Sequence, residues 1–564
     1  MAKKKRKKKK QDSYVRFIWI LIALAAAAAV ISLCLQKLLP SRERQDTAAY
    51  FSITDGNKLG LSVDGTVVED GARLIGDSVC VSLDTAMTTI NRRLYLDESE
   101  GRLCVTTPTV FRSFTYDELV SSGDMIREGD TRYLTLAFLE TWTDMTCTRY
   151  EDPGYLFIRT DFKYEQVSAV KDGVIRVRPT DKAAILCDVT AGETLQVLER
   201  EDAGEDFTAV CSDSGLAGYI RREAVTATAP AGADHVSTIG EYTSLKLDGK
   251  VNMAFYMTNN AQMNATLQDK LDRGVTGINV VAPTWFFLDG PSSITSICDQ
   301  AFVDTCHAAG YQVWALLNDI DGQAASTADT LNALKGTTSR QAIIADMIGT
   351  VTAMGIDGIN VDLERVSEEG APAYLEFLRE LSVECRNRGL FLSVDTYVPM
   401  NYSLYLDREE QGTVADYVVI MCYDEHYAGS TEAGSVASIG FMENGIQRTL
   451  REVPADKIVA AVPFYTRLWE TTDTGAVSSR ILSMSEAADY IRDNNMEVYW
   501  DENVGQYVAE RMTETGTEQI WQEEARSIGE KMALIREFNL AGAAQWRMGE
   551  ETPDIWPVIE AGLS

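Results

Sequence analysis

The sequence predicts a multidomain chain whose C-terminal part, residues 245–564, folds as a (β/α)8 barrel. Eight short apolar runs after residue 245 alternate with helical patterns, and this alternation is typical of parallel β/α units. The preceding region has shorter strand patterns separated by turn residues, which indicate small β-rich domains. At 564 residues the chain is also too long for one ordinary domain.

The N-terminal segment has the pattern of a membrane anchor. The first ten residues carry eight positive charges, and Ser32 is the only polar side chain in the nineteen residues 17–35. An apolar run near this length can span a hydrocarbon core, and the basic flank predicts a cytoplasmic N-terminus. We expect a basic cytoplasmic tail at 1–16, a single transmembrane helix at 17–39 in the cell membrane, and an extracytoplasmic remainder. A cleaved signal sequence is the alternative, because residues 25–29 are all alanine.

The rest of the chain is strongly acidic. Removing the eight N-terminal charges from the net charge of −32 leaves about −40, so nucleic-acid binding is not expected. The three histidines and ten cysteines are scattered and form no CxxC or zinc-type spacing. We therefore predict no metal and no cofactor. The sequence leaves open whether Cys80 forms a disulfide with Cys104, or Cys187 with Cys211.

An internal repeat predicts a duplicated α+β module at residues 48–162. An ungapped shift of 53 residues lays 79–107 on 132–160, with a matching apolar pattern. The identical pairs are Leu83/Leu136, Thr88/Thr141, Glu98/Glu151, Gly101/Gly154, Leu103/Leu156 and Thr107/Thr160. The repeat resembles the stalk-like domain at the N-terminus of copper amine oxidases. No copper ligands accompany it, so the resemblance implies a spacer or adhesion unit.

Residues 168–228 contain five short strand candidates separated by turns. The order Ile-Arg-Val-Arg-Pro at 175–179, Ala-Gly-Glu at 191–193 and Gly-Tyr-Ile-Arg at 218–221 resembles a bacterial SH3-like barrel. That resemblance implies binding of a cell-wall polymer or peptide, and a spacer role is the alternative. Residues 229–244 form the predicted linker.

The predicted barrel strands alternate with helices, as a (β/α)8 barrel requires. They are residues 251–256, 277–283, 312–317, 358–364, 391–398, 417–423, 458–464 and 541–546. In this fold the active site lies at the C-terminal ends of the strands. The interval after residue 467 is longer than a normal loop, so a small α+β insertion is expected at about residues 470–520.

The fourth predicted strand carries acids on one face. In Gly-Ile-Asp-Gly-Ile-Asn-Val-Asp-Leu-Glu at 355–364, the period of two places Asn360, Asp362 and Glu364 together. Two acids in a semi-dry site tend to share a proton, which keeps one available as a general acid. Asp357 has the wrong parity for this face and is expected to organise the entry of the strand.

This strand resembles the signature DxxDxDxE of glycoside hydrolase family 18. Three further blocks of the family pattern follow in order: Met-Cys-Tyr-Asp at 421–424, Pro-Phe-Tyr-Thr-Arg-Leu-Trp at 463–469 and Gln-Trp-Arg at 545–547. The resemblance covers residues 245–564 and is closest to the spore and cell-wall branch, which acts on peptidoglycan.

The resemblance implies a retaining, substrate-assisted hydrolysis of β-linked N-acetylglucosaminyl bonds, in peptidoglycan or a chitin-like glycan. Glu364 would be the acid/base, and Asp362 would orient the acetamido group of the substrate. Tyr423 would hydrogen-bond the acetamido carbonyl, Asp424 would support the sugar, and Trp546 would form an apolar floor under it.

One position departs from the family pattern, because Asn360 stands where chitinases usually have aspartate. An amide cannot take a proton, so we expect the pKa of Asp362 to be less perturbed than it would be with three acids on this face. We also expect Asp362 to receive an N–H hydrogen bond from Asn360. Further side chains near strand ends are candidates for the substrate groove, although packing would explain each nearly as well: Trp285, Asn318, Tyr397, Tyr465 and Arg467. His426, which directly follows the motif of the sixth strand, is another candidate.

Two other functions stay open. A lectin-like surface protein would bind glycan without hydrolysing it, but the intact Glu364 argues against this alternative. A scaffold would bind a partner protein through residues 48–228.

Overall fold

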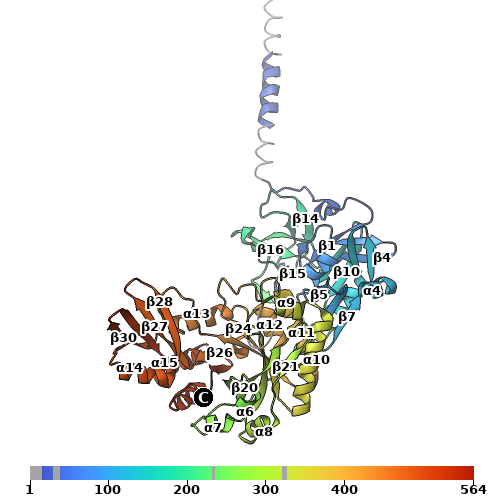
Figure 1. Cartoon of the computed structure of the whole chain (residues 1–564). Coiled ribbons are helices and arrows are strands. Elements are labelled where there is room, and N and C mark those ends of the chain that lie inside the picture. The colour runs from blue at the N-terminus through green and yellow to red at the C-terminus, as the bar shows by residue number, and fades with distance from the viewer. Residues whose placement is uncertain (1–14, 29–38, 232–234, 321–326) are drawn as a thin grey trace, which may run out of the picture. The chain divides into compact units, whose positions relative to one another are not determined.

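The computed structural model describes residues 15–28, 39–231, 235–320 and 327–564. The chain divides into two compact units. The first consists of residues 1–92 and 119–238, and the second of residues 93–118 and 239–564. Figure 1 labels the elements in chain order.

Residues 15–28 are helical. Within the described part of the chain, no helix combines the length and the apolar character needed to cross a membrane. Residues 1–14 of the predicted tail and 29–38 of the predicted span lie outside the described residues.

The internal repeat has the expected order of strand, helical turn and hairpin. The first copy contains β4 (Ser78–Ser82), α3 (Leu83–Thr85), β5 (Leu94–Asp97) and β6 (Arg102–Thr106), and the second contains β9 (Thr131–Thr135), α5 (Leu136–Trp142), β10 (Thr146–Glu151) and β11 (Gly154–Arg159). β4 and β9 pair antiparallel with Val81 opposite Leu134, which are 53 residues apart. The two copies therefore meet at equivalent residues.

The two hairpins then belong to different sheets, so residues 48–162 do not form one module as predicted. The hairpin β10–β11 joins the first-unit sheet of order β10-β11-β1-β3-β4-β9-β8, where β1 is Lys58–Val63, β3 is Ala72–Ile75 and β8 is Met125–Glu128. Strands β5 and β6 instead form a three-stranded sheet with β7 (Phe111–Thr115), and this sheet belongs to the second unit.

The predicted SH3-like region is an antiparallel sheet of order β14-β13-β17-β16-β15-β12-β18. Its strands are β12 (Glu165–Ser168), β13 (Gly173–Arg176), β14 (Ile185–Val189), β15 (Thr194–Val197), β16 (Phe207–Cys211), β17 (Ala217–Arg221) and β18 (Ala229–Pro230). Its core continues into that of the preceding sheet, since Phe51 and Tyr155 pack in one cluster with Val167 and Leu195. The two regions thus share one compact unit, and the SH3-like fold stays a prediction.

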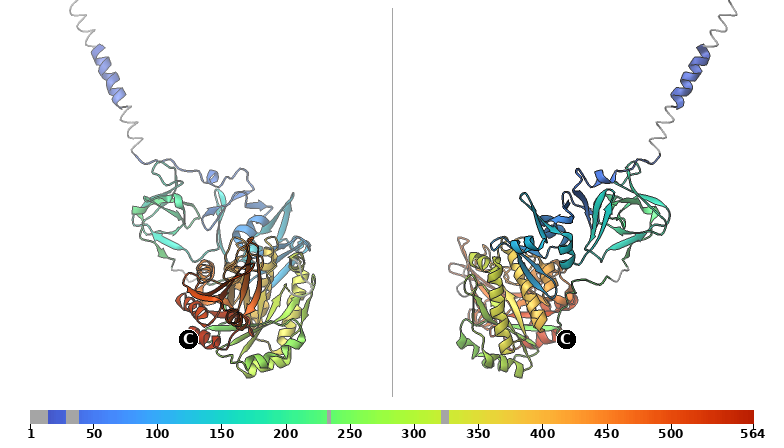
Figure 2. Two further views of the ribbon diagram at one scale, coloured as in Figure 1. Left: turned by 60° about the vertical axis from the view of Figure 1, so that its left-hand side comes forward. Right: turned by 90° about the vertical axis from the view of Figure 1, so that its right-hand side faces the viewer.

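The second unit contains the predicted barrel. Its strands are β19 (Val251–Tyr256), β20 (Val280–Leu288), β22 (Gln312–Asn318), β23 (Gly358–Asp362), β24 (Phe391–Tyr397), β25 (Tyr417–Met421), β26 (Ile458–Pro463) and β32 (Gly542–Trp546). Each pairs in parallel with the next, and β32 pairs with β19, which closes the ring. Helices such as α10 (Thr337–Met354) and α11 (Ala371–Arg388) lie outside the strands (Figures 1 and 2).

Alternation along each strand produces two packed layers. On β23, Ile359 and Val361 point outward and pack against the helices. Inside the barrel, Trp314 stacks on Phe391 with ring centroids 5.1 Å apart. This apolar packing fills the lower interior, so the polar residues of β23 lie above a closed floor rather than in a pore.

The long interval after β26 holds the expected α+β insertion. It begins at β27 (Tyr465–Thr472) and continues through β28 (Val477–Ser483), α14 (Met484–Asp493), β29 (Glu497–Asp501), β30 (Gln506–Thr513) and β31 (Gly516–Gln522). The five strands form an antiparallel sheet, drawn in orange to red in Figure 1.

The sheet β5–β7 is attached to the barrel helices by buried polar contacts. Asp97 Oδ2 accepts a hydrogen bond of 2.6 Å from the backbone N–H of Thr337, at the N-terminus of α10. Thr106 Oγ1 donates to Glu376 Oε1 at 3.0 Å. These contacts satisfy polar groups that would otherwise be buried without partners, which explains why the hairpin leaves its repeat.

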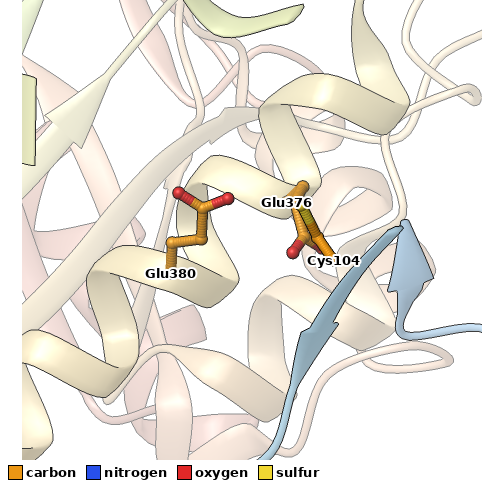
Figure 3. A group of neighbouring side chains, drawn as sticks. All are labelled: Cys104, Glu376 and Glu380. Carbon is orange, nitrogen blue, oxygen red and sulfur yellow. The ribbon is translucent and has the colours of Figure 1, made fainter. Parts of the chain in front are cut away.

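Three potential metal ligands meet at the same interface. Cys104, Glu376 and Glu380 bring ligand atoms within 4.8 Å of one another (Figure 3). Both glutamates already have cationic partners, because Arg340 pairs with Glu380 at 2.8 Å and Arg379 pairs with Glu376 at 3.3 Å. Burial also raises the pKa of the Cys104 thiol, which keeps it protonated. We interpret the group as a buried ion-pair network and not as a metal site.

Candidate active site

The fourth barrel strand carries the central acids. Helix α10 ends at Gly355, whose φ of 66° allows the chain to turn into β23. Asn360 and Asp362 then point into the barrel and are buried. Glu364 lies two residues beyond the strand and is half-buried.

Asp319 holds the segment that carries Glu364. This buried residue directly follows β22, and its Oδ1 accepts a hydrogen bond of 3.0 Å from the backbone N–H of Glu364. Its Oδ2 accepts hydrogen bonds from the N–H of Arg365 at 3.1 Å and from Thr330 Oγ1 at 3.0 Å. The sequence analysis missed Asp319, although its place after the third barrel strand is a signal.

The environment of Glu364 favours the protonated form of its carboxyl group. Burial raises the pKa of Glu364, and a hydrogen bond of 2.8 Å from the Tyr397 hydroxyl to Oε2 offsets only part of that rise. A carboxylic acid with a raised pKa can donate a proton near neutral pH. Tyr397, one of the predicted groove candidates, thus reaches this acid from β24.

A third buried acid comes from the neighbouring strand. Asn360 Nδ2 donates to Asp395 Oδ1 at 2.7 Å and to Ser393 Oγ at 2.8 Å. The expected hydrogen bond from Asn360 to Asp362 is therefore wrong, because the amide gives its hydrogens to β24. The sequence analysis missed Asp395, although Ser393, Asp395 and Tyr397 share one face of their strand.

The pKa of Asp362 is strongly raised, contrary to expectation. Burial raises its pKa well above the ordinary value, and the charges of Glu364, Asp395 and Asp319 raise it further. The prediction failed because Asn360 removes one acid from the strand while Asp395 supplies another from next to it.

Glu364 borders a cavity of about 540 Å³. Its lining is Glu364, Tyr397, Met400, Tyr402, Met421, Tyr423, Asp424, Glu425, Tyr427 and Phe441. Tyr402 and Tyr427 are 61% and 55% exposed. Apolar faces combined with a few convergent polar groups are typical of a small-ligand site, and they suit a sugar ring.

Of the other predicted residues, Tyr423 lines this cavity, and Tyr465 and Trp546 pack beside Tyr423 without being part of the lining. Tyr465 O–H donates to Asp424 Oδ1 at 2.5 Å. Burial, followed by the charge of Asp362, raises the pKa of Tyr423 well above its ordinary value, so this phenol stays a neutral donor. Trp546, at the end of β32, packs in one cluster with Tyr465 and Tyr423.

Trp285, His426 and Arg467 are absent from the cavity lining. Trp285 lies at a register shift in β20, is fully buried, and donates from Nε1 to Asn264 Oδ1 at 2.9 Å, so the groove assignment is wrong. His426 Nδ1 lies 2.9 Å from the carbonyl oxygen of Ser435. Arg467 Nη1 donates to Ser479 Oγ at 3.1 Å.

Asp357 precedes β23 and accepts a hydrogen bond of 2.8 Å from the N–H of Val313, at the entry of the neighbouring strand. This position is at the opposite end of the strand from Glu364. The described cysteines are free thiols.

Acids with raised pKa values, at the C-terminal end of a (β/α)8 barrel and beside a tyrosine-lined cavity, are typical of a glycoside hydrolase site. The chain belongs to the glycosyl hydrolases family 18, whose model matches residues 251–551. It thus has a glycoside hydrolase domain, and its relatives in sequence include cortical fragment-lytic enzymes.

A cortical fragment-lytic enzyme of Bacillus subtilis (strain 168) is 27% identical over 253 residues, which are 43% of this chain and 58% of the relative. The Bacillus anthracis enzyme of the same name is 26% identical over 235 residues, or 40% of this chain and 54% of the relative. The chain thus matches little more than half of the length of these relatives. The crystal structure of a chitinase from Chromobacterium violaceum ATCC 12472 has a TM-score of 0.50 at 21% identity, covering 56% of this chain and 99% of the chitinase. At that identity the likeness supports the fold alone.

Proposed function

We propose that this protein hydrolyses β-linked N-acetylglucosaminyl bonds in peptidoglycan, or in a chitin-like glycan, with retention of configuration. The observation that carries the proposal is the placement of Glu364. Burial raises the pKa of its carboxyl group, Oε2 accepts a hydrogen bond from the Tyr397 hydroxyl, and the residue borders the cavity.

In this mechanism Glu364 protonates the glycosidic oxygen as the bond from that oxygen to the anomeric carbon breaks. The carbonyl oxygen of the substrate's own acetamido group attacks the anomeric carbon, so no second enzyme carboxylate is needed as nucleophile. Asp362 orients the acetamido group and Tyr423 donates a hydrogen bond to its carbonyl oxygen. Glu364, now ionised, takes a proton from the water that opens the cyclic intermediate.

Asp424, held by Tyr465, would bind a sugar hydroxyl, and Trp546 would lie beneath the ring. The name of the cortical fragment-lytic relatives supports a cell-wall glycan that contains N-acetylglucosamine. Purified sacculi and chito-oligosaccharides are both test substrates.

The deciding experiment compares full-length wild type with Glu364→Gln on both substrates, followed by product mass analysis. Removing the acid should lower hydrolysis by about 10²–10⁴-fold. Glu368→Gln is the matched control, because it removes an exposed acid of the same loop and should leave the rate unchanged. Unchanged turnover in Glu364→Gln would sink the proposal, and binding without turnover in the wild type would favour the lectin-like alternative.

The proposed location is the cell membrane, with the N-terminus in the cytoplasm and the catalytic unit outside. The basic run and the apolar residues 17–35 support it. Fractionation should recover the chain with membranes, and protease added to intact protoplasts should digest the catalytic unit. Recovery of the chain in the medium would instead support a cleaved signal.

A further inference from the structure

Two buried oxygen atoms of the active site have no hydrogen-bond donor among the described residues. They are Asn360 Oδ1 and Asp362 Oδ1. Leaving a buried acceptor without a donor is destabilising. A proton on Asp362 removes part of this cost, because it converts that carboxyl group from an acceptor into a donor.

The register of β23 and β24 places Asp395 beside these atoms. Asn360 is opposite Ser393, and Val361 is opposite Val394. Asp395 is therefore one residue further along and level with Asp362, on the same inner face. Asn360 gives its Nδ2 hydrogens to Ser393 and Asp395. Only its carbonyl oxygen remains for Asp362.

We propose that Asp395 is a positioning residue of this glycosidase: it holds the Asn360 amide with its carbonyl oxygen free for Asp362, and thereby keeps a proton on Asp362 before substrate binds. An ionised carboxyl group only accepts hydrogen bonds, so it attracts the NH2 end of the amide. The role rests on the proposed function, in which Asp362 and Glu364 act on the substrate together.

The surrounding charges favour this distribution of protons. Titratable groups from several elements face Asp362 and Asp395: Asp319 after β22, Glu364 after β23, Tyr374 on α11, Tyr397 on β24 and Tyr423 after β25. Asp424, also after β25, acts on Glu364. Arg365 is the nearby cation, and it lowers the pKa of Glu364 and Asp319. Burial raises the pKa of Asp362 and of Asp395. The hydrogen bond from Asn360 favours the ionised form of Asp395, whereas Asp362 has no such bond, so the proton stays on Asp362.

The test is the pH profile of kcat/KM for full-length Asp395→Asn, on whichever glycan the wild type cleaves. Removing this negative charge lowers the pKa of the pair Asp362 and Glu364. The alkaline limb should move to lower pH by about one unit. Ser393→Ala is the matched control, because it removes the other acceptor of the amide without changing charge, and it should leave the limb in place.

The double variant Asn360→Asp/Asp395→Asn replaces the acid lost from β24 with one on β23, beside Asp362. It should bring the alkaline limb of the pH profile back toward the wild-type position. A uniform loss of activity in Asp395→Asn with an unmoved limb overturns the proposal, since a merely structural residue would give that result.

A second measurement does not depend on turnover. A buried acid with a raised pKa in the folded state contributes stability that is present below its unfolded pKa of about 4 and is lost as pH rises through the folded pKa. The Tm of the wild type should therefore fall more steeply with rising pH than the Tm of Asp395→Asn. Parallel Tm curves overturn the proposal. If the wild type cleaves neither glycan, the proposed function fails, and the Tm comparison still decides the role of Asp395.

Discussion

The second unit contains two groups of buried acids with opposite surroundings. Beside α11, Glu410 accepts hydrogen bonds from Arg93 at 2.7 Å and from Arg379 at 2.9 Å. At the end of the barrel, Asp362 and Asp395 lie among other acids and an amide. Burial raises the pKa in both places, but the arginines bring the pKa of Glu410 below its ordinary value, whereas the pKa values of Asp362 and Asp395 stay raised.

The contrast shows that burial alone does not mark a catalytic acid. At Glu410 the partners decide, because two guanidinium groups stabilise the carboxylate and hold its pKa below the ordinary value, whereas Glu380 beside Arg340 keeps a pKa raised to about 8. The acids paired with arginine attach the sheet β5–β7 to the barrel helices. Asp362 and Asp395 have an amide and other acids beside them instead of an arginine, and their pKa values stay raised.

The largest expected effect comes from removing the cation between the paired acids. Arg379→Met leaves Glu376 and Glu410 buried with fewer partners, which should lower the free energy of unfolding by about 3–5 kcal/mol. Urea unfolding measures the change. Arg492→Ala is the control, because its pair with Asp489 is exposed and should contribute less than about 1 kcal/mol. Equal small losses in both variants would show that the paired acids do not depend on their arginines.

A smaller effect is expected at the catalytic acid. Tyr397→Phe removes the hydrogen bond that lowers the pKa of Glu364, so that pKa should rise. The alkaline limb of kcat/KM should then move up by about one pH unit, opposite to the shift in Asp395→Asn. Tyr405→Phe is the control, because its hydroxyl donates to the carbonyl of Val366 and not to an acid. A downward shift in Tyr397→Phe would contradict the assigned role.

The smallest effect is expected at the rim of the cavity. Tyr427→Ala removes an exposed aromatic face, and the loss of about 1 kcal/mol of stacking should raise KM about fivefold with little change in kcat. Tyr499→Ala is the control, because Tyr499 is exposed on β29 of the insertion. Steady-state kinetics on chito-oligosaccharides distinguishes the two variants, and equal KM values would remove Tyr427 from the sugar site.

The sequence by itself determined the barrel and its central strand. The alternation of apolar runs predicted all eight strands, and the period of two placed Asn360, Asp362 and Glu364 on one face. These features depend on side chains a few residues apart, so local periodicity is sufficient to predict them.

Only the tertiary structure decided which acids stand together and which receive a cation. Asp319 and Asp395 reach Glu364 and Asp362 from neighbouring strands, and the register shift in β20 turned Trp285 into the core. One hairpin of the repeat joined the barrel unit because its polar groups found buried partners there. Such contacts join residues far apart in the chain, and their geometry is set by strand register and packing rather than by local sequence.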